Sequence, residues 1–206
     1  MIAVLDYGMG NLRSVEKAFE HVGAEVVRTS DPEVAAEAEG LVLPGVGAFA
    51  RAMERIRELE LDRFITERAA EGTPVLGVCL GYQLLFESSS ELGGAEGLGV
   101  IEGTVDGLRA DELKIPHIGW EPVQWGRESE LTAGIPDETP FYFVHSFTPR
   151  PANEEDVLAY AVHGERFACA IARPPFFGVQ FHPEKSSAAG LRLLANFAAI
   201  AAPVPA

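Results

Sequence analysis

The chain has 206 residues with a formal net charge of −15, and 47% of its residues are hydrophobic. So negative a charge argues against binding to nucleic acid or to an anionic membrane surface. No apolar run reaches the roughly 18 residues of a membrane span. The hydrophobic content is ample for a core, and the length favours one domain, which we place at residues 1–206.

The first half of the chain alternates short apolar runs with helical patterns. We expect strands at 2–7, 25–28, 41–43 and 74–78, and helices at 12–22, 49–70 and 80–87. Strand–helix alternation at this spacing is typical of a parallel sheet with helices on both faces. We therefore predict an α/β fold with a doubly wound, mostly parallel sheet.

Residues 97–173 have strand-like pieces and turn residues but little helical pattern. We expect strands at 99–105, 122–125, 141–144 and 157–163, several of them antiparallel and extending or covering the main sheet. A last core strand is expected at 178–181 and a closing helix at 191–200. The tail at 202–206 should be frayed.

A cysteine between two glycines is the most informative feature of the chain. Cys79 ends an apolar run, with Gly77 before it and Gly81 after it, and a helical pattern follows at once. This is the pattern of a nucleophile elbow, a sharp strand-to-helix turn with the reactive atom at its tip. Glycines suit a strained turn, and the helix N-terminus favours the thiolate. The competing interpretation is a buried cysteine acting as a small hydrophobe.

A histidine and a glutamate far downstream favour the nucleophile. His182 and Glu184 follow the expected strand at 178–181, so they should lie at the same sheet edge as the elbow. A nucleophilic cysteine needs a base, and the base needs an orienting group. Either residue alone could be an ordinary surface residue, but together with Cys79 they predict a catalytic triad.

The turn after the third strand is a candidate oxyanion hole. Attack by Cys79 on a carbonyl creates an oxyanion that needs preorganised donors. The backbone amide of Leu80 is one candidate, and an amide at Val46 or Gly47 is the other. An ordinary tight turn remains the alternative for Val46 and Gly47.

Neither a metal nor a cofactor is expected. The two cysteines, Cys79 and Cys169, make no disulfide framework, and no Cys/His cluster has metal-ligand spacing. A dinucleotide site at Gly8 and Gly10 is rejected because Arg13 stands where the third glycine belongs. A free reactive thiol suits a reducing cytoplasm, and the N-terminus reads as a strand rather than a signal peptide.

Seven segments together resemble the class I (triad-type) glutamine amidotransferases. Among the members of this family, they are most similar to the glutaminase subunit of imidazole glycerol phosphate synthase. The resemblance runs from the first strand to the last helix. It rests on the segments 6–12 (DYGMGNL), 44–49 (PGVGAF), 77–89 (GVCLGYQLLFESS), 116–120 (PHIGW), 142–146 (YFVHS), 178–184 (GVQFHPE) and 182–187 (HPEKSS).

The resemblance implies a role for each matched residue. Cys79 is expected to be the nucleophile, His182 the general base and acid, and Glu184 its orienter. L-Glutamine should contact Gln83, Ser146 and Phe147. The strand at Val46 and Gly47 should need a peptide flip to complete the oxyanion hole. The positions expected at the partner interface or in gating are Asn11, Trp120, Tyr142 and Lys185.

The resemblance also implies a partner and a pathway. Ammonia from glutamine would pass to a (β/α)8-barrel cyclase subunit in a heterodimer, in a step of histidine biosynthesis. Three residues depart from the family pattern: Tyr82, Glu121 and Phe147 stand where Met, Asn and Tyr are usual. The alternatives are an amidotransferase feeding another synthase, such as the anthranilate or pyridoxal phosphate type, a freestanding cysteine hydrolase, and a catalytically dead binding module.

Overall fold

The computed structural model describes residues 1–110 and 113–202, in which nine strands form one sheet. Its strands are β1 (Ile2–Leu5), β2 (Val26–Thr29), β3 (Gly40–Gly45), β4 (Val75–Cys79), β8 (His117–Trp125), β9 (Thr139–His145), β11 (Val157–His163), β12 (Glu165–Arg173) and β13 (Phe176–Val179). They are ordered β2-β1-β3-β4-β13-β12-β11-β8-β9. The first five pair in parallel and the remaining four antiparallel. The predicted α/β class is confirmed.

A second, four-stranded sheet lies beside the main one in the described part of the chain. It is formed by β5 (Phe86–Ser89), β6 (Ala95–Glu96), β7 (Ile101–Gly107) and β10 (Phe147–Pro151). Since β9 ends at His145 and β10 begins at Phe147, the chain passes from one sheet to the other at Ser146. This crossing brings the second sheet close to the edge where β4 ends.

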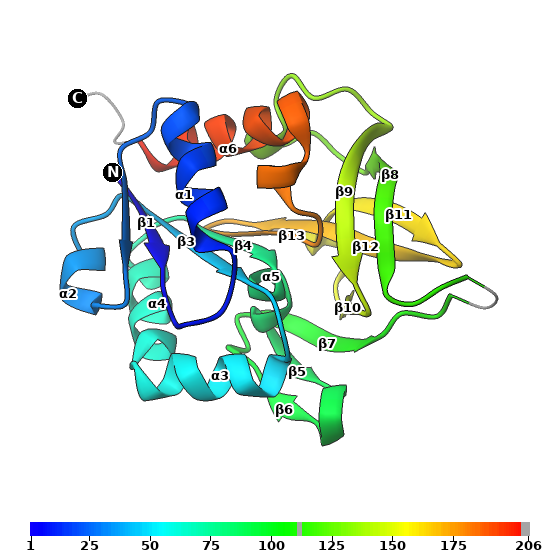
Figure 1. Cartoon of the computed structure of the whole chain (residues 1–206), viewed down its shortest axis with the longest axis horizontal. Coiled ribbons are helices and arrows are strands. Elements are labelled where there is room, and N and C mark those ends of the chain that lie inside the picture. The colour runs from blue at the N-terminus through cyan, green and yellow to red at the C-terminus, as the bar shows by residue number, and fades with distance from the viewer. Residues whose placement is uncertain (111–112, 203–206) are drawn as a thin grey trace.

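Helices cover both faces of the parallel strands (Figure 1). They are α1 (Leu12–His21), α2 (Pro32–Ala35), α3 (Phe49–Glu58), α4 (Leu61–Ala70), α5 (Leu80–Leu84) and α6 (Ser187–Ala201). In α1 the buried residues fall on one stripe, as the sequence pattern indicates. One core cluster joins α1 and α6 to one sheet face, and a second joins α3, α4 and α5 to the other.

The structure corrects several predicted boundaries. The helix predicted at 49–70 is two helices, α3 and α4, because Glu60 takes a left-handed conformation with φ 57°. The helix expected at 80–87 ends at Leu84, since Phe86 is buried in β5 and pairs with β7. Strands β10 and β12 were not predicted as separate elements. Of the predicted frayed tail, residues 203–206 lie outside the described residues.

Within residues 1–110 and 113–202, every helix is too short or too polar to span a bilayer.

Candidate active site

Cys79 lies at the tip of a sharp strand-to-helix turn. It is the last residue of β4, and α5 begins at the next residue. Its backbone has φ 54° and ψ −107°, a conformation that non-glycine residues rarely adopt. Such strain persists only where surrounding structure enforces it, and it is concentrated at functional sites. The predicted elbow therefore forms, with Cys79 only 5% exposed.

The two glycines flanking Cys79 are required by close backbone packing. A Cβ on Gly77 would lie 2.7 Å from the Gly81 carbonyl oxygen and from the Cα of Tyr82. A Cβ on Gly81 would collide with the carbonyl of Leu43 in β3. Neither position tolerates a side chain without a shift of the backbone, so the Gly-x-Cys-x-Gly pattern follows from the geometry of the turn.

His182 and Glu184 lie at the same edge of the sheet as Cys79. Strand β13 pairs in parallel with β4, with Val179 opposite Val78, so the segments that follow the two strands emerge side by side. The Nδ1 atom of His182 donates a hydrogen bond to Oε1 of Glu184 at 2.9 Å. Both side chains are 3% exposed. A buried imidazole thus has a carboxylate partner beside the elbow.

Two neighbouring groups raise the pKa of the buried His182 ring. Burial alone would lower this pKa, but the Glu184 hydrogen bond and the charges of Cys79 and Glu184 raise it to about 10. With Nδ1 engaged by Glu184, the other ring nitrogen is left for the sulfur. The arrangement favours an imidazolium beside the sulfur and the carboxylate, which is the environment of an activated cysteine.

A pocket of about 280 Å³ opens beside Cys79. Its lining includes the predicted oxyanion residues Val46, Gly47 and Leu80 and the predicted substrate residues Gln83, Ser146 and Phe147. Gly47 has φ 118°, which is strained for any side chain. The structure therefore brings every residue of these two predicted groups to one cavity.

Gln180, which is not among the predicted site residues, joins the pocket to the sulfur. Gln83 Nε2 donates hydrogen bonds to the Phe147 carbonyl at 3.0 Å and to Oε1 of Gln180 at 3.1 Å. Gln180 Nε2 in turn donates to Sγ of Cys79 at 3.7 Å. The signal was a polar residue amid the apolar run at 177–181. Glu91 was also missed; it lines the pocket and accepts a hydrogen bond from the Phe49 amide at 2.7 Å.

Two of the four predicted interface residues share a cavity with two residues of the triad, and the other two follow from them through ring contacts. Asn11 and Lys185 line a small cavity of about 10 Å³ together with His182 and Glu184. Lys185 Nζ is 5.8 Å from the ring centroid of Tyr142, whose ring meets Trp120 edge to face at 5.9 Å. Trp120 is 48% exposed.

Two buried histidines support one wall of the pocket. His145 donates from Nδ1 to the Phe147 carbonyl at 2.9 Å, and its Nε2 is 3.0 Å from Nδ1 of His117. Burial lowers the pKa of His145 to about 3. Burial, with a contribution from His163, lowers the pKa of His117 to about 4. Both rings are thus neutral near pH 7, and they fix the backbone at Phe147.

Two of the three departures from the family pattern, Tyr82 and Phe147, have simple structural accounts. The fully buried Tyr82 hydroxyl donates to the Ala168 carbonyl at 3.3 Å, and its ring fits because position 178 is glycine. Phe147 contributes its backbone carbonyl to the hydrogen bonds at Gln83 and His145. Those bonds need no hydroxyl on the ring.

This geometry is suited to acyl transfer through a covalent intermediate. It places a strained cysteine and glycine-bearing backbone around one cavity, with a buried, paired imidazole at the same sheet edge, and these are the parts needed for nucleophilic attack and oxyanion stabilisation.

Comparison with known proteins agrees with this geometry. The family model described as "Glutamine amidotransferase class-I" matches residues 3–201. The chain is 50% identical to "Imidazole glycerol phosphate synthase subunit HisH" of Salinibacter ruber, covering 97% of this chain and 94% of that protein. It is also 50% identical to the protein of the same name from Moorella thermoacetica, over 95% and 93%. A solved structure titled "Crystal structure of glutamine amidotransferase" matches with TM-score 0.77 at 21% identity, over 97% and 98% of the two chains.

Proposed function

This chain belongs to the class-I glutamine amidotransferases, and from that premise we propose that it is the glutaminase subunit of imidazole glycerol phosphate synthase. It acts in histidine biosynthesis by hydrolysing L-glutamine to glutamate and ammonia. The observation that carries the proposal is Cys79 at a strained elbow beside the buried His182–Glu184 pair. The chain is 50% identical to each of two proteins named as subunits of that synthase, over 97% and 95% of its length.

The proposed reaction begins with the Cys79 thiolate. It attacks the side-chain amide carbon of glutamine, and a tetrahedral oxyanion forms. His182 as imidazolium gives its proton to the leaving nitrogen, the carbon–nitrogen bond breaks, and ammonia departs from a γ-glutamyl thioester. The neutral His182 then takes a proton from water, whose oxygen attacks the thioester. Glutamate leaves and the thiolate is restored, while Glu184 holds the ring in place throughout.

The oxyanion is stabilised by backbone amides. The amide of Leu80 follows the nucleophile directly, as in other elbows. The second donor is an amide at Val46 or Gly47, in the turn where Gly47 has a positive φ of 118°. Each such donor contributes about 2.7–4 kcal/mol to the transition state. We propose that the peptide at Val46–Gly47 must flip before it can donate.

The glutamine substrate is held by the opposite wall of the pocket. Gln83 lies beside it, and the backbone at Ser146 and Phe147 receives its α-amino and carboxylate ends. The hydrogen bonds from Gln83 and His145 to the Phe147 carbonyl support this wall. Since binding polar ends requires preorganised donors and acceptors, this rigidity favours a specific small substrate.

The ammonia passes to a partner subunit, a (β/α)8-barrel cyclase, within a heterodimer. Exposed apolar side chains on one face of β8 support a docking surface there, at Ile118 and Trp120. Ammonia is a nucleophile only while neutral, so transfer sheltered from water preserves its reactivity. Asn11, Tyr142 and Lys185 would contact or gate this route. Residues 1–206 would act as one domain in the cytoplasm, where free thiols persist.

The experiment is to measure glutamate release with and without the barrel subunit and its ribotide ligand. We expect weak release by the lone chain and strong release in the loaded complex. Cys79→Ala should abolish release yet support synthesis from added ammonium salts, whereas Cys169→Ala, at the other free thiol, should keep glutaminase activity. High activity of the lone chain, or hydrolysis of unrelated esters, would favour a freestanding hydrolase. Stimulation only by a different synthase would reassign the partner.

A further inference from the structure

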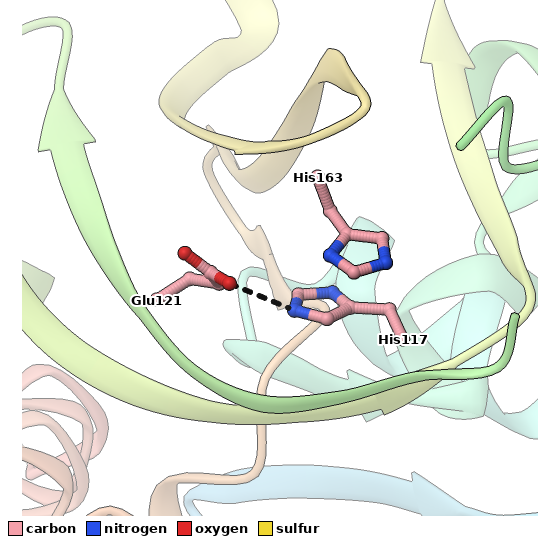
Figure 2. A group of neighbouring side chains, drawn as sticks. All are labelled: His117, Glu121 and His163. Atoms are coloured by element: carbon pink, nitrogen blue, oxygen red, sulfur yellow. Dashed lines mark ion pairs between the residues drawn. The ribbon is translucent and has the colours of Figure 1, made fainter. Parts of the chain in front are cut away.

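Three side chains that could ligate a metal meet outside the pocket. His117 and Glu121 lie on β8, and His163 is the last residue of β11. One nitrogen or oxygen atom from each lies within 4.8 Å of those of the other two. Figure 2 shows the carboxylate of Glu121 and the two imidazole rings turned toward one another. The sequence spacing predicts no metal site here, because the third residue comes from a distant strand.

Hydrogen bonds set the direction in which His117 presents its lone pair. The Phe147 carbonyl can only accept, so Nδ1 of His145 carries the hydrogen. In a neutral His145 ring, Nε2 is then an acceptor, and the hydrogen between the rings belongs to Nδ1 of His117. A neutral His117 therefore has a bare lone pair on Nε2. The Phe147 carbonyl, at one end of this series of hydrogen bonds, thus sets the tautomer of both rings.

That lone pair faces a carboxylate. Nε2 of His117 is 3.5 Å from Oε1 of Glu121, and His117 is 1% exposed. Within the described ranges, Nε2 is a buried polar atom without a hydrogen-bond partner. Two acceptors that face each other repel, and a buried acceptor left unmatched costs free energy. A cation between them would turn this unfavourable contact into two favourable ones.

His163 supplies a third donor from above the His117 ring. Its Nε2 is 3.1 Å from the Lys114 carbonyl, so Nε2 carries the hydrogen and Nδ1 is bare in the neutral ring. The two rings are stacked, with centroids 4.0 Å apart and planes 15° from parallel. A shared ion requires the partly exposed His163 ring to tilt out of this stack, because a metal lies near the plane of each imidazole that binds it.

We propose that His117, Glu121 and His163 form a binding site for a single divalent transition-metal ion, of which Zn²⁺ is the best match. Two imidazole nitrogens and one carboxylate oxygen suit Zn²⁺, with water as the fourth ligand, whereas Mg²⁺ and Ca²⁺ favour all-oxygen sites. The hydrogen bond from His117 Nδ1 to His145 is the outer contact that typically orients a metal-binding histidine. The site lies outside the triad and goes beyond the proposed function.

The test is calorimetric titration of ZnCl₂ into the full-length Cys79→Ala chain, in which the catalytic thiol cannot compete for the ion. We expect one Zn²⁺ per chain and little binding of Mg²⁺. His163→Gln and Glu121→Gln, both at partly exposed positions, should each weaken Zn²⁺ binding by about tenfold or more. His21→Gln removes an exposed histidine on α1 and should leave binding unchanged.

A second measurement identifies the ligands directly. Co²⁺ bound to the same Cys79→Ala chain should show visible d–d absorption typical of nitrogen and oxygen ligands, which His163→Gln should weaken. Thermal denaturation without metal checks that each variant is folded. The proposal is overturned if the Cys79→Ala chain binds no Zn²⁺ stoichiometrically, or if His163→Gln and Glu121→Gln bind it as tightly as their parent.

Discussion

Gly81 packs against the carbonyl of Leu43 so closely that even a methyl group on its Cα would overlap the Leu43 oxygen. The contact joins the first turn of α5 to β3, the strand that leads into the Val46–Gly47 turn. The contact between these two backbone segments therefore fixes the separation between the elbow and the Val46–Gly47 turn.

Gly81→Ala should destabilise the fold by about 3 kcal/mol or more, because neither backbone segment can move without disturbing the sheet. Urea denaturation measures the change, and thiol labelling of Cys79 should show a more accessible sulfur. Gly107→Ala is the matched control, since a Cβ there meets no atom within 4 Å and φ is not positive. A Gly81→Ala chain as stable as Gly107→Ala would contradict this account of the elbow.

Glu184→Gln should lower the pKa of His182 from about 10, because the neutral amide no longer stabilises the imidazolium. Glutaminase kcat should fall by about 10²–10⁴-fold, the usual contribution of a positioned acid or base. NMR titration of the imidazole follows the pKa, and glutamate release follows kcat. Glu71→Gln, at an exposed end of α4, serves as the control and should change neither quantity. An unaltered His182 pKa in Glu184→Gln would show that Cys79 alone sets it.

The parts of the site that could be predicted from sequence are those with local causes. The turn at Cys79 is encoded by its neighbouring glycines, and the place of His182 follows from the rule that parallel strands share a carboxyl edge. The contact of Gln180 with Cys79 depends on the register of β13 against β4, which a single sequence does not reveal.

The same distinction between local and tertiary causes explains where the predicted element boundaries were wrong. The break at Glu60 interrupts a continuous helical pattern and uses a left-handed residue that is not glycine, so it carries no local signal. Strand β8 begins at His117, well before the predicted residue 122, because its pairing with β9 outweighs the weak strand preference of Gly119. Tertiary pairing decided the start of β8.

Gly47→Pro should abolish stimulation of glutaminase by the partner, because proline requires φ near −65° and Gly47 has φ 118°. Glutamate release is compared with and without the loaded partner, and thermal denaturation checks folding. Gly23→Pro places the same backbone conflict in the turn after α1, at φ 85°, far from the pocket. It should lose stability but keep stimulation. If Gly47→Pro is still stimulated, the proposed peptide flip does not take place at Gly47.

The stability of the chain should fall as the pH decreases from 6.5 to 5, because His145 stays neutral in the folded state. Its folded pKa is about 3, against 6.5 in the unfolded chain, so in this range the unfolded state binds the extra proton. The resulting slope approaches 1.4 kcal/mol per pH unit for this ring, and His117 adds to it in the same direction. His182 opposes this trend only weakly, because it is protonated in the folded state and at least half protonated in the unfolded chain below pH 6.5. Urea denaturation with a chelator present measures the slope, which should become shallower in His145→Asn and stay unchanged in His21→Asn. Equal slopes in all three chains would mean that the His145 ring is already charged in the folded protein.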